Sequence, residues 1–477
     1  MSKLKRYYPI IVLLLWTAGC WGFFQFWYPY HFFYQEQNQI FLWSWDYLST
    51  YFDKVGGIAK LTGDFLTQFY YYLFAGATIL SLCLLAIGIM LYLALRKLKV
   101  MKAVSLVLAL TTMTFIAVCH FSVSYRLSST ISILGWCTVG TVLSVSWAGH
   151  RKNRPYCAIT AVILIPITYL LFGYPYIKRI QKPDFILEQD FAIDNEYRLG
   201  NYDKVIETIT KSDGWNDHML LFYNLIWAQR GELPDHLMDF TPNNLGTFEK
   251  IGPETPRMTI NNMNELYWVL GDMTFTERAA MMTYVFSPEN RNVRMIKRLA
   301  ECNIVSGDTL AANKYLRILS KTFAYREWAK MMEEHVSKGQ LPPYYAEKTK
   351  LVNSHDTVTT SDNAHFLMMQ LLDANPDNTI ALDYILCSTL LLKDIENFKR
   401  DYDRYCIDTE KPRLKTLYQE ALCIWLAGTG AQQDEWQKYI KRQEVMKQFI
   451  EYNNQRGNPR FKGTYWYYFD KQKAPEI

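Results

Sequence analysis

Long apolar runs separated by short polar breaks fill the first 180 residues of the chain. Five of these runs are close to the length, about 20 residues, that a helix needs to cross the hydrocarbon core of a bilayer. The runs cover residues 8–28, 70–95, 103–121, 131–148 and 157–176. The pattern therefore predicts an N-terminal domain, residues 1–180, with about five transmembrane helices.

From residue 181 to residue 477 the apolar positions recur at helical spacing, with short breaks between segments. One such set follows Gly200 and lies at i, i+3, i+4 and i+7: Tyr202, Val205, Ile206 and Ile209. Residues at these spacings share one face of a helix. A glycine that closes one helix before an aromatic residue opens the next is similar to a tetratricopeptide repeat (TPR).

The same arrangement returns twice further along the chain. After Gly307 the residues at helical spacing are Ala312, Tyr315, Leu316 and Leu319. Ala364 and Phe398 are 34 residues apart, which is the period of this repeat class. The interval from Ala312 to Ala364 is not a multiple of that period. We therefore expect an all-α fold whose residues 181–477 form a soluble TPR-like helical-repeat domain, with an irregular helical bundle as the alternative.

Two segments of the second domain stand apart from the repeats. Proline and glycine residues at 241–264 predict a loop between repeat blocks. The aromatic run at 463–469 is expected either to cap the last repeat or to approach the membrane interface.

The first loop, residues 29–69, is long and yet rich in aromatic residues, so it is predicted to be an interfacial segment with a helix at about 38–52 and a turn at Gly56. Its carboxylates Glu36, Asp46 and Asp64 each lie near apolar residues. A carboxylate in such a loop is typical of membrane glycosyltransferases, in which it acts as a base or holds a metal near a lipid phosphate. The competing interpretation is that these carboxylates are solvated and have no catalytic role.

Charge and motifs limit the possible functions. Lysine and arginine total 51 and are scattered among 46 acidic residues, so no nucleic-acid-binding surface is predicted. Ionisable residues are almost absent from the predicted spans, which argues against transport. The motifs HExxH and GxSxG do not occur, and His355 and His365 match no established metal spacing. We expect no cofactor and no bound metal.

Basic residues predict the orientation in the membrane. Residues 96–102 and 150–154 are rich in lysine and arginine, as is the N-terminus, and such segments favour the cytoplasm. Five crossings then place the second domain outside, whereas four or six crossings would place it inside. If it lies outside, disulfides are allowed among Cys302, Cys387, Cys406 and Cys423, the last two being the nearest pair in sequence.

Several stretches together resemble an uncharacterised family of multi-span membrane proteins of Bacteroidota, which carries a domain of unknown function. The stretches are the basic N-terminus and residues 33–37, 56–57, 65–72 and 465–468. The resemblance implies a Gram-negative inner-membrane protein but supplies no activity and no functional residues.

Two functional hypotheses follow. The first is a non-enzymatic protein of the inner membrane whose periplasmic helical-repeat domain binds an envelope protein or glycan. The alternative is a membrane-embedded, glycosyltransferase-like transferase that acts on a lipid-linked envelope precursor through the first loop, with Glu36, Asp46 and Asp64 as its candidate residues. Membrane lipid is an expected partner in both.

Overall fold

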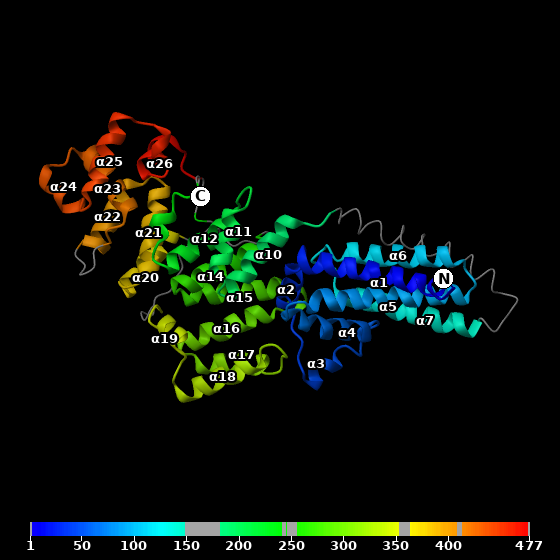
Figure 1. Ribbon diagram of the computed structural model, residues 1–477. Coiled ribbons are helices and arrows are strands. Elements are labelled where there is room, and N and C mark those ends of the chain that lie inside the picture. Colours follow the sequence, from blue (N-terminus) through cyan, green and yellow to red (C-terminus); the bar gives the residue numbers. More distant parts are fainter. Residues whose placement is uncertain are drawn as a thin grey trace. The chain divides into compact units, whose positions relative to one another are not determined.

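The protein is described from a computed structural model that covers residues 2–147, 182–240, 245, 255–352, 363–407 and 413–475. Within these ranges the regular structure is entirely helical, which confirms the predicted fold class at this level. The chain forms two compact units (Figure 1). Unit 1 contains residues 1–195, 287–297 and 314–334, and unit 2 contains residues 196–286, 298–313 and 335–477. The predicted boundary at residues 180 and 181 lies outside the described residues.

Unit 1 contains four helices that are long and apolar enough to cross a membrane. They are α1 (Ser2–Phe26), α5 (Ala75–Lys97), α6 (Lys102–Cys119) and α7 (Leu127–Trp147). These helices match the first four predicted spans. The fifth predicted span, residues 157–176, lies outside the described residues.

Small and aliphatic side chains fill the space between these helices. The fully buried ones include Leu13 of α1, Leu80, Leu84 and Ile87 of α5, and Ala109 and Met113 of α6. Gly88 allows α5 and α6 to approach closely, since a Cβ atom there would come within 2.3 Å of the Met113 sulfur.

The first loop is folded into short helices rather than one long one. These are α2 (Tyr30–Gln37), α3 (Trp45–Ser49), α4 (Gly57–Thr67) and the 3₁₀ turn η1 (Gln68–Tyr71). The helix predicted at residues 38–52 is therefore wrong except at α3. The backbone before α3 bonds to distant segments instead: the Gln39 carbonyl accepts from Val293 N–H, and Trp43 N–H donates to the Lys321 carbonyl. The turn predicted at Gly56 is present, with φ of 78° at that residue.

Helix α4 packs along α7 through a glycine. A Cβ atom at Gly63 would lie 2.5 Å from the Ser128 Cα atom, which belongs to the backbone and has no room to move. This contact fixes how closely the two helices can approach.

We expect Gly63→Ala to lower the free energy of unfolding by about 1–3 kcal/mol, because the added methyl group must push α4 away from α7. The midpoint temperature of thermal unfolding, measured on the full chain in detergent, tests this. The control is Gly135→Ala, since a Cβ atom at Gly135 of α7 meets nothing within 4 Å. Equal midpoints for the two variants would contradict the close approach.

Unit 2 is a succession of short helices in which neighbours along the chain pack together, for example α14 on α15, α20 on α21, and α22 on α23. Its helices begin with α11 (Tyr202–Thr210), α12 (Asp217–Gln229), α13 (Leu233–His236), α14 (Arg257–Leu270), α15 (Met273–Phe286) and α19 (Pro343–Thr349). They continue with α20 (Ala364–Ala374), α21 (Thr379–Leu391), α22 (Ile395–Tyr402), the π-helical turn η4 (Asp403–Ile407) and α23 (Thr416–Thr429). The last are α24 (Gln433–Tyr439), α25 (Gln443–Asn454), the 3₁₀ turn η5 (Pro459–Phe461) and α26 (Tyr465–Lys471).

Four helices contain residues of both units: α10 (Phe185–Arg198), α16 (Val293–Ser306), α17 (Thr309–Leu319) and α18 (Arg326–Lys338). Of these, α17 carries the second predicted repeat face. There Ala312, Leu316 and Leu319 are fully buried, and in α11 so are Val205 and Ile209. The loop predicted at 241–264 is too long, because α14 begins at Arg257. Pro256 precedes that helix, a position that needs no N–H donor.

The aromatic tail folds back within unit 2. Helix α26 packs on α23, and Tyr465 and Tyr468 donate hydrogen bonds to the carbonyl oxygens of Leu390 and Leu391. The contacts agree with the predicted cap rather than with an approach to the membrane. Cys302, Cys387, Cys406 and Cys423 are all buried free thiols, so the disulfide that the sequence allowed between Cys406 and Cys423 is not formed.

Candidate functional site

The first loop of unit 1 takes part in a buried polar network with two later segments, α10 and residues 287–297. Of the three candidate carboxylates, Glu36 and Asp64 are buried within it, and each contacts the turn around Gln39. Gln39 N–H donates to the Glu36 carbonyl, and the Gln39 side-chain amide donates to the Asp64 carbonyl. Asp46 is exposed on α3. The structure thus places the backbone of two of the three candidates against the same residue, Gln39.

Asp64 is held by one phenol and one guanidinium group, and a second phenol lies behind the first. The Tyr51 hydroxyl donates to Asp64 Oδ2 at 2.7 Å and is itself 2.7 Å from the Tyr47 hydroxyl. Arg291 Nη1 lies 2.7 Å from the Tyr51 hydroxyl and 3.3 Å from Asp64 Oδ2. Burial raises the pKa of Asp64, although Tyr51 and Arg291 oppose the rise. The carboxyl group is therefore enclosed by internal partners.

Glu289 gathers three cations beside this group. Lys60 Nζ and Arg126 Nη1 lie 2.6 Å and 2.7 Å from its two carboxylate oxygens, and Arg291 Nη1 is 3.6 Å away. Burial alone would raise the pKa of Glu289, but Lys60 and Arg126 lower it to about 2. Its backbone has φ of 60°, a left-handed conformation that costs a residue other than glycine roughly 1–2 kcal/mol. The ion pairs hold a strained turn at the start of residues 287–297.

A second ion pair of unit 1, between Arg294 and Asp194, is more fully buried than the pairs of Glu289. Arg294 binds Asp194 with both guanidinium nitrogens, at 2.6 Å and 2.9 Å, and both side chains are buried. Arg294 Nη1 also donates to the Gln37 side-chain oxygen at 3.1 Å. One guanidinium group therefore joins α16, α10 and the end of α2.

Glu188 of α10 caps the beginning of α2. Its carboxylate accepts hydrogen bonds from the backbone N–H groups of Tyr30 and His31, the latter at 3.1 Å. The first N–H groups of a helix have no acceptor within the helix, so an acceptor from another segment satisfies them. Burial raises the pKa of Glu188 to about 8, although these two N–H groups oppose the rise. Burial also lowers the pKa of the neighbouring His31 to about 3.

These shifts predict how stability depends on pH. The pKa of Glu188 is raised on folding from 4.5, so its contribution is fully present below about pH 4.5 and is lost as pH rises toward 8. The loss is at most about 1.4 kcal/mol per pH unit. Glu188→Gln removes this titration but keeps His31. We therefore expect the difference in unfolding temperature between the unsubstituted protein and Glu188→Gln to change with pH. The unsubstituted protein should lose stability relative to the variant as the pH is raised from about 5 to about 8.

The control for this prediction is Glu207→Gln on α11. Lys211 lowers the pKa of Glu207, which is exposed and stays ionised across the range. The difference between this variant and the unsubstituted protein should therefore be flat. A flat difference for Glu188→Gln as well would show that Glu188 does not titrate in this window.

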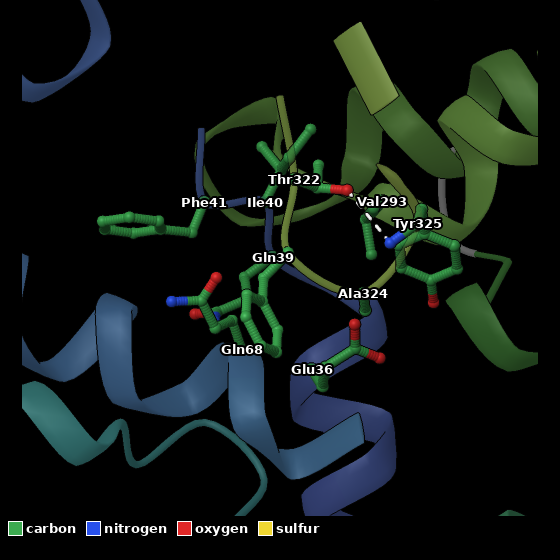
Figure 2. A pocket seen from close by; sticks show the side chains of 10 residues that line it. Glu36, Gln39, Ile40, Phe41, Gln68, Val293, Thr322, Ala324 and Tyr325 are labelled. Atoms are coloured by element: carbon green, nitrogen blue, oxygen red, sulfur yellow. Dashed lines mark hydrogen bonds between the residues drawn. The ribbon is translucent and has the colours of Figure 1, made fainter. Parts of the chain in front are cut away.

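Glu36 faces a small hollow of unit 1 (Figure 2). Gln39, Gln68, Val293, Thr322 and Tyr325 are among its lining residues, and its volume is only about 20 Å³. Pockets that bind small molecules usually measure about 300–1,000 Å³. Among the described residues no cluster of histidine, cysteine, aspartate or glutamate could hold a metal ion.

The residues that complete the network were missed by the sequence analysis. Arg291 and Arg294 follow the stretch Ser-Pro-Glu-Asn at 287–290, which marks a polar turn between two helices. That turn is the only feature of the local sequence that sets Arg291 and Arg294 apart. The partners lie more than 200 residues from the loop residues they contact, as in the 227-residue separation of Arg291 and Asp64.

The described residues define an all-helical protein in which four helices of membrane-crossing length share a unit with a buried polar network. The sequence matches the family described as "Family of unknown function (DUF6057)" over residues 5–179 and 175–472, and the chain belongs to this family. Comparison with curated proteins and with solved structures gives no match.

Proposed function

We propose that this protein is a non-enzymatic component of a bacterial inner membrane, which anchors a TPR-like helical array in the periplasm for binding an envelope protein or glycan. The observation that carries the proposal is the enclosure of Asp64. Asp64 is 5% exposed, and Tyr51 and Arg291 both bind its Oδ2 atom, so the carboxylate is withdrawn from solvent. A base must reach the proton that it removes, at about 2.6–3.2 Å.

The form of unit 2 supports the binding role. Successive helix pairs that pack on their neighbours create an extended surface rather than a deep pocket. Large apolar side chains are exposed on this unit, among them Leu310, Phe366 and Ile450. Such positions suit contact with a partner along the array.

The proposed orientation places the N-terminus in the cytoplasm. Arg96 and Lys97 end α5, and Lys102 begins α6, so the connection between these helices is basic. Positive charge of this kind favours the cytoplasmic side.

Photo-crosslinking in intact cells tests the proposal. A crosslinking amino acid is placed at Leu310, Phe366 or Ile450 of the full chain, and at the buried Phe398 as a control. We expect one product of defined mass from at least one exposed position and none from Phe398. Glu36→Gln, Asp46→Asn and Asp64→Asn should leave its yield unchanged. Absence of any product, or its loss in Asp64→Asn with the fold intact, would contradict the scaffold role.

A second candidate is the transferase acting on a lipid-linked precursor. The specific observation in its favour is that Lys60, Arg126 and Arg291 gather beside Asp64, where a lipid phosphate could replace Glu289. This candidate predicts that a lipid-linked sugar co-purifies with the full chain and is detected by mass spectrometry. Its amount should change in Asp64→Asn but not in Asp46→Asn.

A further inference from the structure

The segment from α3 to the start of α4 exposes large apolar side chains in close succession. Trp45 and Ile58 are 74% and 72% exposed, Phe52 is 58% exposed, and Val55 is fully exposed. The rings of Trp45 and Phe52 lie 6.4 Å apart. Removing each such side chain from water is worth about 1.5–3 kcal/mol, so leaving four of them in water is costly.

The position of this segment relative to the helices of unit 1 indicates that its apolar side chains face lipid. Helix α4 is joined to α5 through η1, so its Thr67 end lies at the level where α5 begins. From there α4 packs along α7, and Gly63 contacts Ser128 near the start of that candidate span. The Gly57 end of α4 therefore runs beside the span and away from the level of the helix ends.

Exposed aromatic residues mark that same level. Phe26 and Trp27 lie where α1 ends, and Tyr71, Tyr72 and Phe74 lie where α5 begins. Aromatic side chains collect at the boundary between hydrocarbon and water. Val55 and Ile58 lie beyond this aromatic level, on the side of the hydrocarbon.

The basic residue that follows the segment, Lys60, fits the same placement. Lys60 does not extend outward from α4 but pairs with Glu289, which also binds Arg126 directly before α7. Long basic side chains near a membrane direct their charged ends to the polar boundary in this way. Asp46, Asp53 and Lys54 are exposed within the segment, so an inserted tip has to keep their charged ends at the polar boundary.

We propose that residues 45–58 form a membrane-inserted hairpin tip, in which Trp45, Phe52, Val55 and Ile58 lie among lipid acyl chains beside α7. Its partner is the bilayer itself, and the exposed face continues the lipid-facing surface of the candidate spans. This goes beyond the proposed function, because it holds whether the protein is a scaffold or an enzyme.

Spin labels on the full chain test the proposal. Val55→Cys is labelled and reconstituted in vesicles of phosphatidylethanolamine and phosphatidylglycerol. Collision with oxygen, which concentrates in lipid, is compared with collision with a water-soluble nickel chelate. Leu310→Cys, at an 85% exposed site of unit 2, is the aqueous control, and Val139→Cys of α7 is the lipid control. The signal from native cysteines is subtracted by labelling the unsubstituted protein.

We expect the Val55 label to behave like the Val139 label, with a ratio of oxygen to nickel accessibility several-fold above that of Leu310. A ratio equal to that of Leu310 would place the tip in water and overturn the proposal. Low accessibility to both reagents would show that protein covers the tip, which would also overturn it. Val55 is fully exposed, so the substitution itself should leave the fold intact.

Discussion

Arg294→Met is expected to lower the free energy of unfolding of unit 1 by about 3–5 kcal/mol, because it leaves the Asp194 carboxylate buried without its counter-ion. Arg294 and Asp194 form two parallel hydrogen bonds in a site that excludes water from both side chains. Amide hydrogen exchange of α10 and α16 in the detergent-solubilised chain measures the loss locally. Exchange in both helices should accelerate.

Two further variants make this prediction specific. Lys211→Met breaks the exposed pair of Lys211 with Glu207 and should cost less than about 1 kcal/mol. Adding Asp194→Leu to Arg294→Met removes the unpaired charge and should recover a large part of the loss. If Arg294→Met cost no more than Lys211→Met, the ion pair would not be buried as described.

Trp466→Ala is expected to destabilise unit 2 by about 3–5 kcal/mol, since it opens a large cavity in the last part of the array. Trp466 is 1% exposed, lies 5.4 Å from the Phe449 ring, and donates its indole N–H to the Glu420 carbonyl at 2.8 Å. Hydrogen exchange should accelerate in α23 and α25, which pack around the indole ring. The rest of unit 2 should respond less.

The matched control is Trp215→Ala in the same unit. Trp215 is 44% exposed and lies against Phe240, so its removal leaves little cavity. Its cost should be about 1 kcal/mol, in line with substitutions away from the core. Equal effects of the two substitutions would argue against the C-terminal cap.

Periodicity predicted the helices of this protein well where each helix buries one face. The buried Val205 and Ile209 of α11 occupy positions that the sequence pattern assigned to a packed face. Length and hydropathy likewise identified four helices that are long and apolar enough to cross a membrane. The failure at residues 38–52 has a different origin. Aromatic residues there occur at helical spacing, but Gln39 and Trp43 use their backbone groups to bind segments far along the chain.

The candidate site was predictable only in part, for the same reason. Acidic residues among aromatic ones drew attention to Glu36 and Asp64, and both are buried in the network. Asp46 also lies among aromatic residues and yet is exposed, because the local sequence does not determine which of these side chains the fold buries. No local pattern indicated that Arg291, Glu289 and Arg294 would face the first loop.

Arg291 follows Asp64 by 227 positions, so the two partners are synthesised at different times. At about 5–20 residues per second, the ribosome makes Arg291 roughly 10–45 s after Asp64. Throughout that interval the nascent first loop lacks its guanidinium partners, while the helices on either side of it are already available for insertion. A lipid-embedded hairpin tip would hold α4 against α7 during this wait, so that the late segment docks onto a loop already in place.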